Sequence, residues 1–120
     1  MVKKQKTRIL PSAREKKRYL VFEINAKDKI DNFDPVYEAI YARCMRYLGE
    51  LGMSKANIYI LKDKWNKNLQ RGLIRVNNKH THDVRAALSL LDEINGQHVN
   101  VKTIGMSGIL KKAQEKYLRN

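Results

Sequence analysis

Two kinds of hydrophobic spacing alternate along the sequence, and their order limits the possible folds more than any other feature. Residues 18–25 alternate between two faces and predict a strand whose Leu20, Phe22 and Ile24 face a core. Further strands are expected over residues 56–62, 70–77 and 99–104. Apolar residues recur every three or four positions after the first and the third of these strands, which predicts two amphipathic helices. The predicted order is therefore strand, helix, strand, strand, helix, strand.

Capping residues predict where the two helices begin and end. Asp34-Pro35 marks the start of the first helix, because aspartate accepts hydrogen bonds from first-turn amides and proline has no amide hydrogen to leave unpaired. We expect this helix to end near Gly49 or Gly52. The second helix is expected to begin near residues 81–83 and to stop at Asn95-Gly96.

This order is that of the ferredoxin-like split βαβ sandwich, an α+β fold in which two helices cover one face of an antiparallel four-stranded sheet. The pattern is βαββαβ with one added helix at the C-terminus, which Ser107 is expected to cap. A chain of 120 residues corresponds to one domain, here residues 18–120. Residues 1–17 show no sustained apolar period and predict a flexible basic N-terminal arm that adds affinity for a partner without specificity.

The charge of the chain predicts a polyanionic partner. Lysine and arginine number 25 against 12 aspartates and glutamates, which gives a net charge of +13. The arm lacks the apolar face of a membrane-surface helix, so RNA or DNA is the preferred partner. No apolar run is long enough for a bilayer span or a signal peptide, and the single cysteine fits a reducing compartment. We therefore expect a cytoplasmic protein with no membrane contact.

The sequence offers no evident catalytic or metal-binding group. His80 and His82 are two residues apart and point in different directions, with no carboxylate cluster to supply a third metal ligand. Cys44 lies on the apolar stripe of the first helix, where a buried side chain is expected rather than a nucleophile. An acyl- or phosphoryl-transfer enzyme is therefore the least supported hypothesis for this fold.

The sheet face away from the two helices is the predicted binding surface. Its side chains are expected to be Tyr19, Val21, Glu23, Arg71, Leu73, Arg75 and Asn77. An aromatic platform for stacked bases is largely missing, so the arginines are expected to contact phosphates or to stack on bases. Val21 and Leu73 indicate that the face is partly covered, either by the last helix or by another protein, and we assign them to a protein interface.

Three segments resemble a known family. They are Arg18-Tyr19-Leu20 leading into Glu23, Arg71-Gly72-Leu73-Ile74-Arg75-Val76, and Gly105-Met106-Ser107-Gly108-Ile109-Leu110-Lys111-Lys112 with Gln114 and Tyr117-Leu118. In this order the chain is similar, from Lys17 to Leu118, to the archaeal ribonuclease P protein component 2 family. The resemblance implies a ferredoxin-like subunit of ribonuclease P, which removes the 5′ leader from precursor tRNA.

The resemblance also implies partners and a division of labour. The catalytic domain of ribonuclease P RNA and the protein component 3 are the implied partners, with a homodimer of this chain inside a heterotetramer as one arrangement. The magnesium ions belong to the RNA, so the protein is expected to bind no cofactor and to have no activity by itself. The alternative function is that of a ribosomal or other general RNA-binding protein.

The predicted RNA contacts combine the charge clusters with the family segments. We also expect Gly105-Met106-Ser107-Gly108 to form a phosphate-binding helix start, because glycines admit a close ligand and first-turn amides attract anions. The predicted RNA-binding residues are Arg14, Lys16, Lys17, Arg18, Arg71, Arg75, Ser107, Gly108, Lys111 and Lys112.

Overall fold

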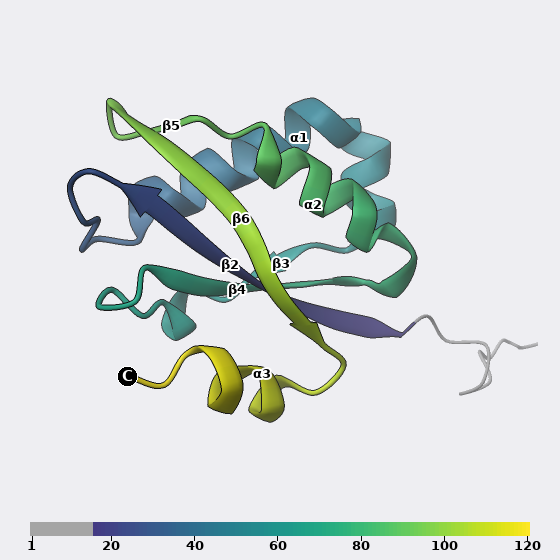
Figure 1. The fold of residues 1–120 in the computed structure, drawn as a ribbon. Helices are drawn as coiled ribbons and strands as arrows, with labels where there is room; N and C mark the ends of the chain where they lie inside the picture. The colour runs from purple at the N-terminus through teal and green to yellow at the C-terminus, as the bar shows by residue number, and fades with distance from the viewer. Residues whose placement is uncertain (1–15) are drawn as a thin grey trace, which may run out of the picture.

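The computed structural model of the protein describes residues 16–120. Its centre is a five-stranded antiparallel sheet, in which the strands follow the order β3-β4-β2-β6-β5 (Figure 1). The strands are β2 (Lys17–Ala26), β3 (Tyr59–Ile60), β4 (Arg71–Asn77), β5 (Glu93–Ile94) and β6 (Gln97–Ser107). The helices are α1 (Asp34–Ala56), α2 (Thr81–Ser89) and α3 (Leu110–Tyr117), with short 3₁₀ turns η2 (Lys62–Lys64) and η3 (Asn78–His80).

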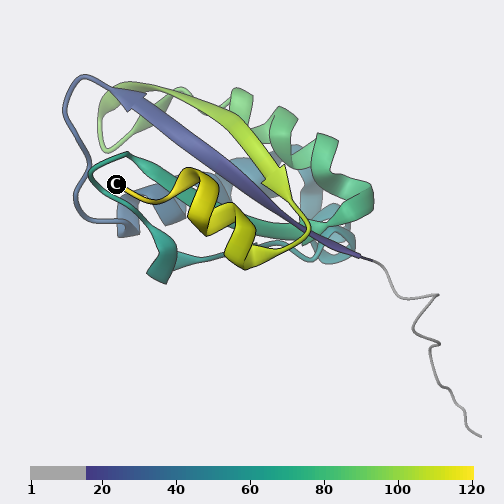
Figure 2. The ribbon, with the colours of Figure 1, turned by 60° about the horizontal axis from the view of Figure 1, so that its bottom comes forward.

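The elements form three layers. Helices α1 and α2 lie on one face of the sheet, and α3 lies across the other face (Figures 1 and 2). The ferredoxin-like βαββαβ order with an added C-terminal helix is thereby confirmed. The sheet has one strand more than expected, because the two-residue β5 pairs with the start of β6.

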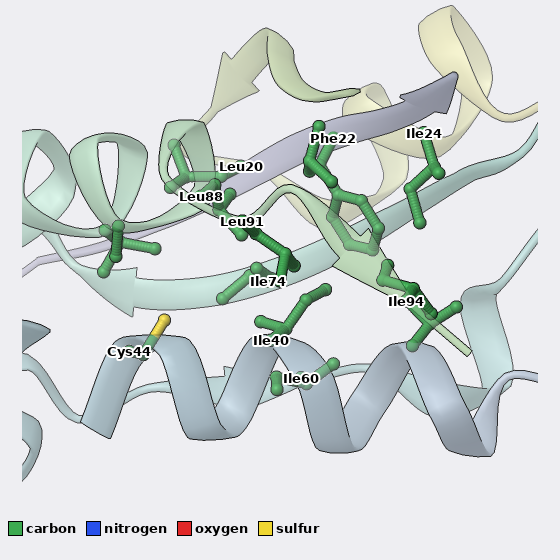
Figure 3. Packing of buried hydrophobic residues seen from close by; sticks show 14 of the residues in the cluster. Leu20, Phe22, Ile24, Ile40, Cys44, Ile60, Ile74, Leu88, Leu91 and Ile94 are labelled. Atoms are coloured by element: carbon green, nitrogen blue, oxygen red, sulfur yellow. The ribbon is translucent and has the colours of Figure 1, made fainter. Parts of the chain in front are cut away.

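The main core lies between the sheet and the two-helix layer. Leu20, Phe22 and Ile24 point into it from β2, as their alternation predicted, and meet Ile40 and Cys44 from α1 (Figure 3). Each of these side chains is at most 2% exposed. The first strand and the apolar stripe of the first helix are therefore assigned correctly by their spacing.

The first helix is longer than expected. Gly49 has φ 75° and ψ 173°, which no helical residue adopts, so the regular helix does break where the glycine predicted. The chain then resumes helical geometry as far as Ala56, which is fully buried. The strand expected over residues 56–62 is consequently reduced to the two residues of β3.

The Asn95-Gly96 pair was assigned the wrong role. It was expected to stop a helix, but α2 already ends at Ser89, and residues 95 and 96 form the tight turn between β5 and β6. Their φ angles are 57° and 81°, the left-handed values that a two-residue hairpin turn requires at both positions. An Asn-Gly pair is a stronger signal for a hairpin than for a helix end, and Ile94 therefore lies in a strand.

The predicted arm falls almost entirely outside the described residues, and Arg14 lies there as well. Lys17 is the first residue of β2 and pairs with Asn77, so the sheet begins one residue earlier than the expected boundary. Within the described part of the chain, no helix is both long and apolar enough to cross a membrane.

Candidate nucleic-acid interface

Helix α3 covers much of the sheet face that was predicted to bind a partner. Val21 and Leu73 are fully buried there and pack with Leu61 and Ala113 into a second apolar cluster. The sequence predicted that either the last helix or another protein covers this face, and the structure shows that the last helix does. The assignment of Val21 and Leu73 to a protein interface is corrected, since neither side chain is accessible while α3 is in place.

Gly105 belongs to this helix contact rather than to a phosphate site. Strand β6 continues through residue 107, so Gly105 lies inside a strand and not at a helix start. A Cβ atom at position 105 would lie 2.1 Å from Cζ of Tyr117, which means that the tyrosine ring occupies the space that any other side chain would need. The glycine thus allows α3 to approach the sheet closely.

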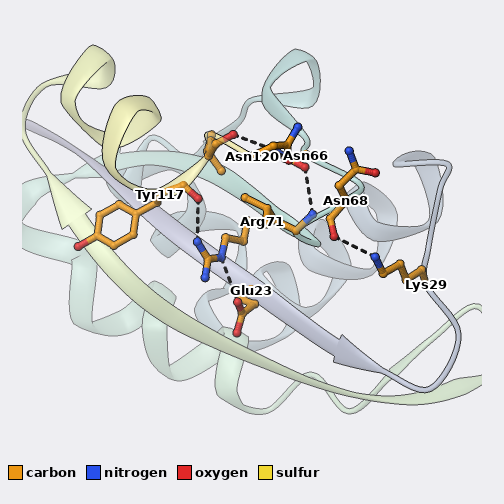
Figure 4. Close-up of polar contacts among 9 residues, drawn as sticks. Glu23, Lys29, Asn66, Asn68, Arg71, Tyr117 and Asn120 are labelled. Carbon is orange, nitrogen blue, oxygen red and sulfur yellow. Dashed lines mark hydrogen bonds and ion pairs between the residues drawn. The ribbon is translucent and has the colours of Figure 1, made fainter.

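Arg71 connects the end of α3 to the sheet. Its Nε donates to Oε2 of Glu23 at 3.0 Å, and its Nη1 donates to the carbonyl oxygen of Tyr117 at 2.9 Å (Figure 4). The Asn66 amide also donates to the Leu118 carbonyl at 2.7 Å. Arg71 thus uses two of its donor atoms to join an acidic partner and the helix end, and its predicted contact with RNA stays a prediction.

Arg75 lies on the same face of the same strand but has a different environment. No hydrogen bond or ion pair engages its guanidinium group within residues 16–120, and its Nε is buried without a partner. Its Cζ lies 4.9 Å from the centre of the Tyr59 ring, a cation–π contact. Among the predicted sheet arginines, Arg75 is thus the one that keeps its charge and donors for a ligand.

One row of side chains crosses the sheet at this end. Arg75 pairs with Tyr59 on one side and with Tyr19 on the other, and Tyr19 also pairs with Ser107 of β6. Residues opposite one another in a sheet point to the same face, so all four side chains lie on the α3 side. The sequence predicted few aromatic residues on this face and did not include Tyr59, because the pairing of β3 with β4 could not be assigned from the sequence.

Arg18 and Gly108 meet at the same end of the sheet. The Arg18 Nε donates to Oδ1 of Asn78 at 3.0 Å, and a Cβ atom at position 108 would lie 3.5 Å from Arg18 Nη1. Ser107 does not cap α3: the helix begins at Leu110, and the Ser107 hydroxyl accepts from the amide of Ile109 at 3.1 Å. The predicted phosphate-binding helix start is thus an extended strand end followed by a bend.

The structure brings some of the predicted contacts together and separates others. Lys17, Arg18, Arg75, Ser107 and Gly108 gather where β2 begins and β6 ends, as the register of these strands requires. We call this set the basic end of the sheet. Lys16 immediately precedes it and is exposed, and Lys111 and Lys112 are exposed on the first turn of the adjacent α3.

The cysteine and histidine side chains that were considered for catalysis lie in environments that do not favour catalysis. Burial raises the pKa of the Cys44 thiol from 9.0 to about 11, which is the opposite of what a nucleophile needs. His80 lies 3.4 Å from the Asp83 carboxylate, next to the start of α2. Within residues 16–120 no three histidine, cysteine, aspartate or glutamate side chains gather closely enough to hold a metal ion.

Comparison with known proteins gives one consistent result. The sequence model described as the Rpp14/Pop5 family matches residues 18–118. Ribonuclease P protein component 2 of Pyrococcus furiosus is 38% identical over 108 residues, which are 90% of this chain and 88% of the relative. The protein of the same name from Methanosarcina acetivorans is 35% identical over 113 residues, or 94% and 82% of the two chains. A chain in the cryo-EM structure of yeast ribonuclease MRP shares the fold, with a TM-score of 0.59 and 18% identity over 86% of this chain and 92% of that one.

Proposed function

This chain belongs to the Rpp14/Pop5 family and is a protein subunit of ribonuclease P, and we propose that it supports the catalytic RNA while that RNA removes the 5′ leader from precursor tRNA. The observation that carries the proposal is the family match, which covers residues 18–118 and so reaches from the first strand to the last helix. The role is supported by the basic end of the sheet, where cations from the two neighbouring strands β2 and β4 gather.

The RNA contact is electrostatic in this proposal. Phosphates attract lysine and arginine at long range, and each neutralised phosphate releases counterions, so binding weakens as salt rises. Arg18 and Arg75 supply planar donor groups at the basic end, and Lys17, Lys111 and Lys112 supply mobile charge around it. Gly108 leaves the backbone open to a phosphate beside Arg18.

In the proposed division of labour, the RNA and its magnesium ions perform the cleavage and the protein binds no cofactor. The chain acts in the cytoplasm with a second protein subunit, component 3. Val21 and Leu73 do not contact component 3 in this proposal, because both side chains are buried under α3. The exposed apolar side chains Met106 and Ile109, next to the basic end, are the better candidates for that interface.

Recovery of the protein from cells tests the proposal directly. The chain carrying an affinity tag is purified under mild salt, and the RNA bound to it is sequenced. We expect one dominant RNA, that of ribonuclease P, together with precursor tRNA. A broad mixture of ribosomal or messenger RNA would instead support a general RNA-binding protein and would contradict the proposal.

A further inference from the structure

The Tyr59 side chain is an exposed aromatic ring beside Arg75, whose donors have no partner among residues 16–120. Tyr59 is 56% exposed, although large apolar side chains in a small domain are usually covered. It lies on β3, which is an edge strand of the sheet, and it takes no part in the apolar cluster under α3. The ring is therefore open to solvent on the side that Arg75 does not cover.

Arg75 and Arg71 offer a comparison within one strand. Arg71 is neutralised by Glu23 and bonded to the end of α3, so it serves the fold. Arg75 has no acidic partner within residues 16–120, and its buried Nε donates to nothing in the described structure. A guanidinium group 4.9 Å from a ring centre, with no hydrogen bond to any of residues 16–120, fits a ligand that combines an anion with an aromatic group.

We propose that Tyr59 and Arg75 form a binding site for one unpaired nucleotide of an RNA strand. The base stacks on the open side of the Tyr59 ring, and the Arg75 guanidinium group donates to the neighbouring phosphate. Lys17, whose strand partner Asn77 lies two residues beyond Arg75 on β4, adds charge along the path of the backbone. This proposal rests on the proposed function and extends it: the RNA that contacts Tyr59 and Arg75 is single-stranded.

The chemistry of the site favours an unpaired nucleotide over a duplex. A duplex offers phosphates but hides the faces of its bases, so the tyrosine ring would have no partner. A single strand offers both, and stacking on aromatic side chains together with backbone charge is the usual means of binding it. In the row from Tyr59 through Arg75 to Tyr19, Tyr59 is more than half exposed, whereas Tyr19 packs against the cluster under α3, so the site accepts one base.

The test compares binding of two RNA probes, an oligouridylate and a duplex of equal length, to the full chain and its variants. Because stacking contributes roughly 1–3 kcal/mol per base, Tyr59→Ala should weaken oligouridylate binding about five- to 140-fold. Binding of the duplex should change less than about twofold. Tyr59→Phe, which keeps the ring, should bind both probes like the original chain.

Tyr47→Ala is the matched control, because Tyr47 is exposed to a similar degree, 47%, but lies on α1 in the layer across the sheet. It should leave both affinities unchanged. A photo-crosslink from 5-iodouridine in the oligouridylate should form at Tyr59 in the unaltered chain, which provides a measurement independent of any variant.

The failure of this inference can be told apart from the failure of the proposed function. If the unaltered chain binds ribonuclease P RNA but Tyr59→Ala binds oligouridylate equally well, the stacking site is wrong and the function stands. An oligouridylate that binds without a crosslink at Tyr59 has the same meaning. If the unaltered chain binds neither ribonuclease P RNA nor either probe, the proposed function itself is contradicted.

Discussion

Replacing Gly105 with alanine should destabilise the protein by displacing α3. The added Cβ would lie 2.1 Å from Cζ, 2.4 Å from the hydroxyl oxygen and 2.5 Å from Cε2 of Tyr117. Contacts this short cannot persist, so either the tyrosine ring turns away or the whole helix shifts. The perturbation therefore tests whether the packing of α3 on the sheet contributes to the stability of the fold.

The structure sets limits on the size of the effect. Insertion of one methyl group into a packed contact costs about 1–3 kcal/mol when neighbours adjust locally. If α3 separates instead, Val21 and Leu73 lose their cover, and each fully buried side chain of this size contributes about 1.5–3 kcal/mol. We expect a loss of about 2–3 kcal/mol in the free energy of unfolding, with roughly 6 kcal/mol as the upper limit.

Urea unfolding followed by tryptophan fluorescence and circular dichroism measures this change. With a slope of about 1–3 kcal/mol per molar urea, this loss should lower the midpoint by about 0.7–3 M. Gly108→Ala is the control, because its Cβ would meet only Arg18 Nη1, at an ordinary 3.5 Å, and should leave the midpoint unchanged. Equal midpoints for Gly105→Ala and the original chain would refute the reasoning about α3.

Three further predictions concern stability. Arg71→Met should cost about 1–2 kcal/mol in urea unfolding, because Glu23 loses its charged donor and α3 its link, whereas Arg75→Met should cost almost nothing; equal losses would contradict the assigned roles. Native Cys44 should resist iodoacetamide at pH 8 and react once the protein is unfolded. Because the folded pKa of about 11 exceeds the unfolded value, the free energy of unfolding should fall by up to about 1.4 kcal/mol per pH unit as pH rises from 9 to 11. This pH dependence should be absent in Cys44→Ala. Gly96→Ala should cost about 1 kcal/mol by thermal unfolding, because φ is +81° there, and no loss would contradict the hairpin turn.

Hydrophobic spacing predicted the parts of the fold that a single period controls. The alternation of β2 identified its core face, and the spacing of three and four identified the buried side of α1. Element ends were less predictable, because Gly49 breaks helical geometry without ending the helical segment. The short strand β5 depends on pairing with β6, which no local pattern reveals.

The candidate site shows a different limit. The sequence places Arg71 and Arg75 on one face of one strand, four residues apart, and it assigns them the same role. Only the structure shows that Glu23 and the end of α3 engage Arg71, whereas no hydrogen bond to any of residues 16–120 engages Arg75. Tyr59 was missed because its partner Arg75 lies sixteen residues further along the chain, and local periodicity does not give the register between the two strands.

Cleavage of precursor tRNA by ribonuclease P RNA, measured against magnesium concentration, tests the central claim most directly. The RNA is assayed alone, with the chain and its protein partner, and with the Arg75→Met variant, which the stability measurements are expected to show as folded. We predict that the proteins lower the magnesium concentration needed for cleavage, that Arg75→Met loses part of this effect, and that RNA-free protein cleaves nothing. An unchanged magnesium requirement, or cleavage by the protein alone, would contradict the central claim.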